Sequence, residues 1–302
     1  MAGPGTSERE LSVVLVNYND RAHLPDCLVS LDKALSGLNA EVILVDNRSD
    51  DGSAALVRES FSWVRLVEND RNVGYPRANN LGVRLSRGKF VLFLNTDTVV
   101  PAGAPAGLLA EIRSRPEAGA VGPALVREDG SFQVSFGKKM NFFSELRQKL
   151  VLNAYHRNAL RRSRKPRAVG WLSGACLLAR RSALDAINLF DEGFFLYFED
   201  IDLCSRLAER GFGLVLCPGI KVRHAGGAAT SARPWRSRLE YRRSQLRYYG
   251  KHSSRLSLGL LRLYLKLTVF ILGLPVGRDG ERKSYREGLR EVLAGRNTGT
   301  EG

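Results

Sequence analysis

The sequence predicts an α/β fold with a buried parallel sheet, and two observations carry this prediction. Short apolar runs alternate with amphipathic stretches along the first third of the chain, and this alternation is typical of successive strand–helix–strand units. The chain has 302 residues, of which 44% are hydrophobic and 25% are charged. Such a composition supplies a sizeable core and favours a folded globular protein, with one large domain or two small ones, over a disordered or fibrous chain.

The expected elements follow from these patterns in chain order. Residues 1–10 are small and polar and are expected to be disordered. Apolar runs typical of strands occupy Leu11–Val16, Glu41–Val45, Val64–Val67 and Phe90–Leu94. Helical patterns lie at Arg21–Leu35, with Asp20 as the expected N-cap and Gly37 as the stop, directly after Ser53, and at Arg77–Leu85. Farther on, the sequence predicts a strand over Val169–Ala179, a helix over Ile201–Glu209 that ends at Gly211, and a strand from Leu214 that Pro218 ends.

Positive charge is concentrated in two segments. The chain holds 46 Lys and Arg against 31 Asp and Glu, which leaves a net charge of +15. Residues 138–167 and 233–266 each hold ten Lys and Arg but a single Glu. We therefore expect a main body over residues 11–230 with a basic insertion at 138–167, followed by a basic tail over residues 231–302. Concentrated positive charge attracts either nucleic acid or an anionic membrane surface.

The tail has the pattern of a basic amphipathic helix. Cations recur every fourth residue from Arg243 to Arg255, and Arg262 and Lys266 resume that face, which predicts a basic stripe on one helix that Pro275 ends. The uncharged run Leu267–Gly277 has 11 residues, short of the roughly 20 that cross a bilayer. We therefore expect residues 233–277 to lie on an anionic membrane surface. The alternative is a helix that packs on the main body with its basic face in water.

Cysteine usage and the N-terminus indicate a reducing compartment. The four cysteines form no CxxC pair, lie among apolar residues, and are expected to be reduced core residues, and the first ten residues do not resemble a secretory signal. A cytoplasmic protein, at the inner face of the membrane, is expected. The chain also lacks a GxGxxG after its first strand and a GxxxxGK[ST] loop, so any nucleotide must be held in another way.

Polar residues follow several of the predicted strands, where α/β sheets bind their ligands. They are Asp46-Asn47, Asp97, Glu199-Asp200-x-Asp202 and His224. Each has an ordinary structural alternative, since an Asp after a strand often forms a turn or caps a helix, and a lone His is often a core residue. The aromatic run Phe194–Phe198 before the carboxylates changes that balance, because partly desolvated carboxylates attract a cation or a proton. His224 would serve as a metal ligand beside a carboxylate.

An ordered set of motifs resembles the family-two glycosyltransferases of GT-A fold, particularly their rhamnosyltransferase-like branch. The motifs are SVVLVNYN at residues 12–19, VDNRSDDGS at 45–53, NVGYPRANNLG at 72–82, LNTDT at 94–98, GWLSGA at 170–175, FDEGFFLYFEDID at 190–202, and His224. The resemblance covers roughly residues 11–230 and implies a mixed, mainly parallel sheet. The basic tail lies outside it.

The resemblance also implies the site. The donor nucleotide sugar would contact Asn17, Tyr18, Asp46, Asn72, Gly74, Asn79, Asn80, Thr96 and Asp97. Thr96-Asp97-Thr98 stands where the family has its DxD metal motif, and only Asp97 is a carboxylate. Asp97, His224, diphosphate oxygens and water would hold Mg²⁺ or Mn²⁺. Asp200 would be the general base, with Glu199 beside it. The acceptor side would consist of Trp171, Ser173, Gly174 and Asp202, although Trp171 has a core alternative and Asp202 a helix-cap alternative.

These residues together predict an inverting glycosyltransferase. The expected donor is dTDP-L-rhamnose and the expected acceptor a lipid-linked or polysaccharide glycan of the cell surface. A UDP- or GDP-hexose donor is the alternative within the same fold, because motifs do not report the shape of the sugar pocket. Two remote alternatives are a non-catalytic scaffold and a nucleic-acid-binding module, and no nucleic acid is expected because the chain has no recognised motif for it.

Overall fold

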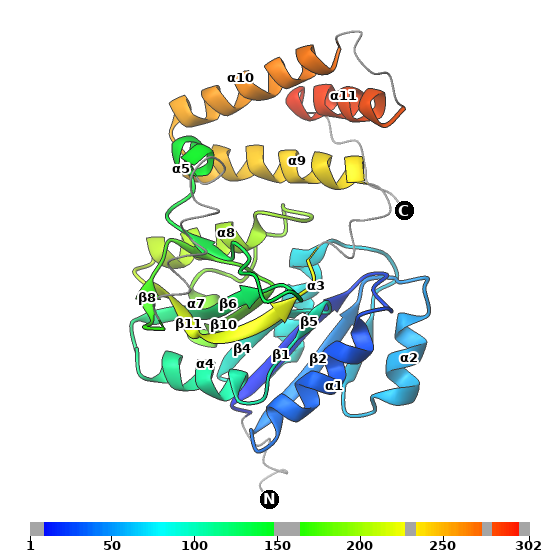
Figure 1. The fold of residues 1–302 in the computed structure, drawn as a ribbon, viewed down its shortest axis with the longest axis vertical. Coiled ribbons are helices and arrows are strands. Elements are labelled where there is room, and N and C mark those ends of the chain that lie inside the picture. The colour runs from blue at the N-terminus through cyan, green and yellow to red at the C-terminus, as the bar shows by residue number, and fades with distance from the viewer. Residues whose placement is uncertain (1–8, 148–163, 227–233, 274–279, 296–302) are drawn as a thin grey trace, which may run out of the picture.

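The computed structural model describes residues 9–147, 164–226, 234–273 and 280–295. A central sheet carries helices on both faces, and three C-terminal helices stack beyond one side of it (Figure 1). Residues 1–8 of the expected disordered N-terminus and residues 148–163 of the basic insertion lie outside the described residues.

The central sheet is mixed and mainly parallel. Four strands run parallel in the order β3 (Arg65–Glu68), β2 (Ala40–Asp46), β1 (Leu11–Asn17) and β4 (Phe90–Asn95). Strand β10 (Cys176–Arg180) lies antiparallel between β4 and β6 (Ala118–Val126). Strand β11 (Gly213–His224) runs parallel to β6 and pairs antiparallel with β5 (Thr98–Val99) and β8 (Arg167–Ala168). The carboxyl ends of β1, β2 and β4 therefore meet at one edge.

Helices cover both faces because the strands alternate their apolar side chains between two cores. Val13 and Leu15 of β1 join the core under α1, α2 and α4, whereas Val14 joins the core under α3, α7 and α8. The first three helices are α1 (Leu24–Leu35), α2 (Ser53–Ser60) and α4 (Ala104–Arg113). The second three are α3 (Tyr75–Leu85), α7 (Arg181–Ala186) and α8 (Glu199–Glu209). All four cysteines are buried and unpaired, as expected.

The expected start of α1 and the expected end of β11 were wrong. Helix α1 begins at Leu24, where Pro25 suits the first turn. The carboxylate of Asp20 does not cap it but contacts His23 and Thr96. Strand β11 also continues past Pro218, because its register against β6 shifts between Cys217 and Lys221 and the missing N–H falls in that irregularity.

The strand expected over Val169–Ala179 is divided in the structure. Strand β9 (Trp171–Leu172) pairs with β7 (Phe136–Gly137) in a separate small sheet, and β10 begins only at Cys176. The chain turns at Gly174 and Ala175, so a turn, rather than a strand, faces α8. The division matters for the site because the Gly174 N–H is thereby free to donate to a side chain.

The C-terminal tail forms three helices, not one long helix. They are α9 (Pro234–His252), α10 (Arg255–Leu272) and α11 (Gly280–Leu293). Helix α9 ends before Ser254, whose side chain accepts from the Ser257 N–H and caps α10. No helix among the described residues is long and apolar enough to span a bilayer.

Helix α9 packs on the main body. This was the alternative to a tail that lies entirely on a membrane surface. Tyr248 and Tyr249 are fully buried in the core that also holds α8. Glu145 of α5 (Phe142–Arg147) is buried and accepts from Tyr249 OH at 2.6 Å and Gln245 Nε2 at 2.7 Å. The first part of the basic insertion and the tail therefore share a core with the rest of the protein.

Asp202 joins the tail to α8. This fully buried carboxylate contacts Arg206 Nε at 2.7 Å, Lys251 Nζ at 2.6 Å and His252 Nε2 at 2.8 Å. Burial acts to raise the pKa of Asp202, but His252, Arg206 and Lys251 outweigh it and hold that pKa below its ordinary value. Asp202 thus does not cap α8, and three basic groups engage both of its oxygens. Its place on the acceptor side stays a prediction.

We expect Asp202→Asn to destabilise the protein by about 3–5 kcal/mol, because it breaks the ion pairs of a buried carboxylate with three basic groups. Since the folded-state pKa of Asp202 is lowered, its contribution is present above the unfolded-state pKa and lost as the pH falls through the folded-state value. Urea unfolding midpoints at neutral and acidic pH measure this. The matched control is Asp185→Asn at an exposed position of α7, where a change within about 0.5 kcal/mol is expected. Equal midpoints for the two variants would contradict the role given to Asp202.

Candidate active site

Asn17 and Asp46 lie side by side at the carboxyl ends of β1 and β2, where they are register partners. Asn17 Nδ2 donates to Asp46 Oδ1 at 2.8 Å, and the Ser49 N–H donates to Asp46 Oδ2 at 2.9 Å. Asn17 Oδ1 is buried with no partner among the described residues. Tyr18 follows, half-buried. The structure thus brings these three expected donor residues together, with one unpaired acceptor at the strand edge.

The loop before α3 closes over the same edge. Asn72 Oδ1 accepts from Asn47 Nδ2 at 2.8 Å and from the Gly74 N–H at 3.0 Å. Gly74 has a φ of +86°, and a Cβ there would lie 2.8 Å from backbone and ring atoms of Phe195, so only glycine fits. This loop therefore contacts the segment that leads to Glu199 and Asp200.

The buried asparagines of α3 have structural partners. Asn80 donates to the Phe190 carbonyl and accepts from the Phe190 N–H, each at 3.0 Å. Asn79 donates to the Tyr75 carbonyl at 3.0 Å, and its own oxygen has no partner among the described residues. Thr96 donates to Asp20 at 2.7 Å. These side chains support the loops around the edge.

Asp97 and His224 lie against each other where β5 pairs with the end of β11. Asp97 Oδ1 is 3.2 Å from His224 Nε2, and Asp97 Oδ2 accepts from the Gly226 N–H at 2.9 Å. Burial acts to raise the pKa of Asp97, but His224 and the Gly226 N–H outweigh it and hold that pKa below its ordinary value. Asp97 is therefore ionised at neutral pH.

Gln133 determines which nitrogen of His224 faces Asp97. Gln133 Nε2 donates to the His224 carbonyl at 2.9 Å, so Gln133 Oε1, which lies 2.8 Å from Nδ1, accepts the Nδ1 proton. Nε2 then lies 3.2 Å from Asp97 Oδ1 and 3.3 Å from Asn95 Nδ2. An imidazole nitrogen and a carboxylate oxygen this close are complementary to a proton or a cation between them.

The donor set fits a divalent cation. A carboxylate oxygen and an imidazole nitrogen are both ligands of divalent ions, and an outer hydrogen bond such as that of Gln133 is the usual support for a metal-binding histidine. Within the described ranges, no group of three or more His, Cys, Asp or Glu is arranged to hold a metal ion. The other positions of an octahedral ion would thus fall to oxygens of a substrate and water, as is common for Mg²⁺.

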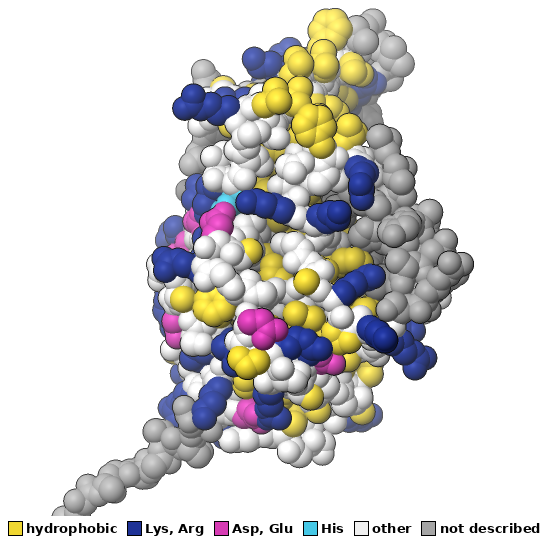
Figure 2. Space-filling model, turned by 90° about the vertical axis from the view of Figure 1, so that its left-hand side faces the viewer, with side chains coloured by type: hydrophobic (Ala, Val, Ile, Leu, Met, Phe, Trp, Pro, Cys, Tyr) yellow, Lys and Arg dark blue, Asp and Glu magenta, His cyan; other side chains and the backbone are white. Residues whose placement is uncertain are grey.

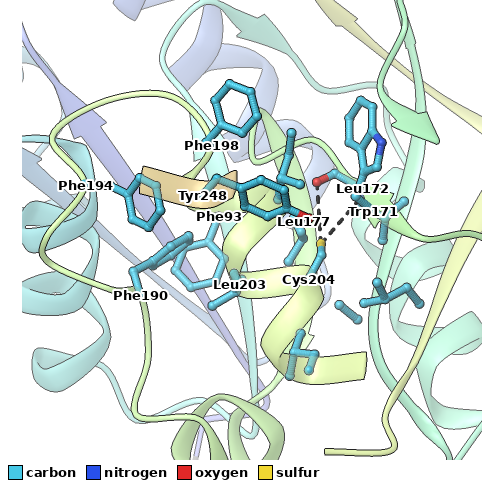
Figure 3. Packing of buried hydrophobic residues seen from close by; sticks show 14 of the residues in the cluster. Phe93, Trp171, Leu172, Leu177, Phe190, Phe194, Phe198, Leu203, Cys204 and Tyr248 are labelled. Carbon is cyan, nitrogen blue, oxygen red and sulfur yellow. Dashed lines mark hydrogen bonds between the residues drawn. The ribbon is translucent and has the colours of Figure 1, made fainter. Parts of the chain in front are cut away.

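Glu199 and Asp200 begin α8 directly after two residues of left-handed backbone. Tyr197 and Phe198 have φ values of +68° and +62°, a conformation that costs free energy for aromatic residues. Helix α9 holds them there, because Phe198 packs on Tyr248 and the Tyr197 OH lies 2.6 Å from Ser237 Oγ. Figure 3 shows Phe198 beside Tyr248 in this aromatic cluster.

The environments of the two carboxyl groups separate their protonation states. Asp200 accepts from the Gly174 N–H at 2.9 Å and the Ile201 N–H at 2.8 Å, while burial raises its pKa above the ordinary value. Burial and then the charge of Asp200 raise the pKa of Glu199 well above the ordinary value, and Glu199 Oε2 has no partner among the described residues. Since two N–H donors favour the charged form of Asp200, Asp200 ionises before Glu199 as the pH rises.

The pair formed by Asp97 and His224 adjoins the pair formed by Glu199 and Asp200. The Asn95 N–H, at the end of β4, donates to the Ala175 carbonyl at 3.0 Å, and the neighbouring Gly174 holds Asp200. Tyr75 donates to Asn95 Oδ1 at 2.9 Å, and burial together with the charges of Glu199, Asp200 and Asp97 raises the Tyr75 pKa. The charges of all three carboxyl groups thus act on Tyr75. Candidate cation ligands on one side and a carboxyl pair on the other suit the transfer of a group away from an anionic leaving group.

The comparisons with known proteins agree with this geometry. The family model described as Glycosyl transferase family 2 matches residues 12–187. A curated relative, N-acetylglucosaminyl-diphospho-decaprenol L-rhamnosyltransferase of Mycobacterium tuberculosis, is 31% identical over 93% of this chain and 97% of its own length. The chain belongs to glycosyltransferase family 2. It is therefore a glycosyltransferase with homologues in polysaccharide biosynthesis, such as O-antigen biosynthesis protein RfbC of Myxococcus xanthus, 28% identical over 72% of this chain and 18% of that protein.

Solved structures of glycosyltransferases share the fold. GalNAc-T7 with UDP, GalNAc and Mn²⁺ aligns over 96% of this chain and 57% of its own, with a TM-score of 0.61 and 16% identity. The mannosyltransferase PcManGT of Pyrobaculum calidifontis, in complex with GDP-Man and Mn²⁺, aligns over 98% and 89%, with a TM-score of 0.59 and 16% identity. At these identities the likeness shows the GT-A fold.

The residues expected on the acceptor side of this glycosyltransferase do not all lie near Asp200. Gly174 contacts Asp200, and a Cβ on Gly174 would lie 3.2 Å from the Asp200 Cβ. Ser173, directly before it, is half-buried. Trp171 is 7% exposed and lies in the hydrophobic core near Leu172 (Figure 3). Trp171 therefore takes the core alternative, whereas Ser173 and Gly174 lie in the segment that contacts Asp200.

Sequence reasoning missed three side chains of the site. Asn95 and Gln133 contact the His224 ring, and Tyr75 donates to Asn95, but each of these bonds joins residues distant in sequence. Tyr75 and Asn95 lie inside motifs that were already noted. Gln133 belongs to no motif, and only the pairing of β11 reveals it.

Proposed function

We propose that this family-two glycosyltransferase transfers L-rhamnose from dTDP-L-rhamnose to a lipid-linked glycan acceptor, with inversion at the anomeric carbon. The observation that carries the proposal is the ionised Asp97, 3.2 Å from His224 Nε2, next to a carboxyl pair in which two N–H donors hold Asp200. The sugar and the lipid acceptor are supported by the name of the 31% identical relative over nearly its whole length. The reaction would take place at the cytoplasmic face of the membrane, where a lipid-linked acceptor is accessible.

Asn17, Tyr18 and Asp46 would bind the nucleoside at the ends of β1 and β2, with the Asn17 oxygen available to a donor on the base. Asp97 and His224 would hold Mg²⁺ or Mn²⁺ against the diphosphate. When bound, that ion supplies positive charge that stabilises the departing diphosphate.

Asp200 would take the proton of the acceptor hydroxyl. The acceptor oxygen then forms its bond to the anomeric carbon as the bond from that carbon to the diphosphate oxygen breaks, and the diphosphate leaves with the electron pair. Attack opposite the leaving group inverts the configuration. Glu199, protonated, keeps a second negative charge away from the incoming hydroxyl.

A donor panel tests the proposal. Nucleotide release from dTDP-rhamnose, UDP-hexoses and GDP-hexoses is measured with polyprenyl-diphosphate-linked acceptors, in Mn²⁺, in Mg²⁺ and in EDTA. We expect metal-dependent release from dTDP-rhamnose alone, and inversion is read by NMR of the product linkage. Release from a UDP- or GDP-hexose instead would replace the donor, and full activity in EDTA would contradict the metal. Donor binding without release under every condition would favour the scaffold alternative.

A further inference from the structure

The outer face of α10 is apolar and exposed. Eleven large hydrophobic side chains are exposed among the described residues, and six of them lie on this helix. They are Leu256, Leu263, Tyr264, Leu267, Phe270 and Ile271, between 44% and 68% exposed. Their spacing of three, four and seven residues places them on one helical face. Figure 2 shows hydrophobic side chains gathered at the end of the molecule where α10 lies.

The opposite face of α10 is buried and therefore fixes which side of the helix faces water. Leu261 and Leu265 are fully buried in the core that also contains Leu239 of α9 and Leu289 of α11. The helix is therefore packed on its neighbours along one side and keeps a second apolar side in water. Such contiguous apolar surface is uncommon on soluble monomers and marks an interaction site.

Cations border the exposed face on one flank. Arg255, Arg262 and Lys266 are exposed and recur at helical spacing, and α10 contains no Asp or Glu. The cations of α9 differ, because Arg247 and Lys251 form ion pairs with Asp191. Part of the basic stripe expected from Arg243 onward therefore forms ion pairs within the protein. The part of the stripe on α10 faces outward.

We propose that the exposed face of α10, with its flanking cations, docks on an anionic lipid surface with the helix axis in the membrane plane. An apolar face bordered by Lys and Arg is the pattern of interfacial helices. A second copy of the chain fits less well, because α10 has no carboxylates to meet the cations of a facing α10. This inference rests on the proposed function only in that a lipid-linked acceptor would lie in the same surface.

Vesicle sedimentation of the full chain tests the surface. We expect the wild type to bind vesicles of phosphatidylcholine with 30% phosphatidylglycerol, and Leu263→Gln/Leu267→Gln to reduce that partition coefficient about tenfold or more. Arg262→Gln/Lys266→Gln should reduce the partition coefficient on the order of tenfold for the anionic vesicles and leave it unchanged for phosphatidylcholine alone. This reduction should be smaller at high salt. The matched controls are Val29→Gln, an exposed apolar position of α1, and Lys33→Gln/Arg210→Gln. Both controls should bind like the wild type.

Equal vesicle binding by all variants, or no binding by the wild type, would overturn the proposal. Light scattering without lipid tests the other occupant. A wild type that is dimeric, with the α10 variants monomeric and the control variants still dimeric, would assign this face to a second copy and overturn the proposal. Release of nucleotide with a water-soluble acceptor analogue is measured in parallel and should be unchanged in the α10 variants. Vesicle binding by a wild type that turns over no donor would leave the docking surface intact and reject the proposed function.

Discussion

Asp200→Asn is expected to lower turnover by about 10²–10⁴-fold, the usual contribution of a positioned general base. The carboxylate of Asp200 is held by two N–H donors at the start of α8, so it has a defined direction as well as a charge. Asparagine preserves the size of the side chain but cannot accept a proton at neutral pH. Nucleotide release under saturating donor and acceptor measures the loss, and an unchanged urea midpoint shows that the variant folds.

The same assignment fixes the direction of the pH dependence. Because burial raises the pKa of Asp200, the ionised base is lost as the pH falls through a value above that of an ordinary aspartate, roughly 3.9. We therefore expect kcat/KM to decline on acidification with a midpoint above that value, and this limb to disappear in Asp200→Asn. Turnover by Asp200→Asn within twofold of wild type would remove Asp200 from the mechanism.

Asp97→Asn is expected to lower turnover on the order of 10³-fold at limiting Mn²⁺, since a cation on a developing negative charge contributes several kcal/mol. The variant removes the carboxylate that faces His224 Nε2 at 3.2 Å but keeps its shape. Raising the Mn²⁺ concentration should restore part of the rate. Turnover as a function of Mn²⁺ concentration measures this.

Asp51→Asn is the matched control for Asp97. Asp51 is a half-buried carboxylate whose pKa is also lowered, because Ser53 and backbone N–H groups outweigh the effect of burial. Its partners are the N–H groups of Arg21 and Ser53 and not a histidine. Its variant should keep the Mn²⁺ dependence of the wild type. A parallel change in both variants would mean that the loss reflects general electrostatics rather than a metal position.

Much of the fold was predictable because its signals are local. The apolar runs at β1, β2 and β4 and the amphipathic stretches between them predict parallel strands with helices. The antiparallel insertion of β10 between β4 and β6 was not predictable from such runs, because strand neighbours are decided by tertiary packing. Helix α4 and strand β6, between residues 104 and 126, were not anticipated at all.

The tail shows why periodicity alone was insufficient. Cations at every fourth residue continue across Ser253 and Ser254, so the pattern resembles one helix. The break depends on the Ser254 cap and on the burial of Tyr248 and Tyr249 against α8. The partners of Asp202 were not predictable either, because Lys251 and His252 lie on the tail, far from Asp202 in the sequence.

The candidate site was predictable in its charged residues and not in their supports. Asp97, His224, Glu199 and Asp200 stand at strand or helix ends within motifs. The hydrogen bond from Gln133 that orients His224 connects residues 91 positions apart. No spacing rule in the chain encodes such a contact.

The most direct test of a cation position adjoining a separate base is calorimetric titration of dTDP with Mn²⁺ into the wild type, Asp97→Asn and Asp200→Asn. Asp97→Asn should lose the Mn²⁺-dependent part of the affinity, while Asp200→Asn binds like the wild type yet does not turn over donor. Undiminished Mn²⁺-dependent binding by Asp97→Asn, or loss of that binding in Asp200→Asn, would contradict the division of the site between these two carboxylates.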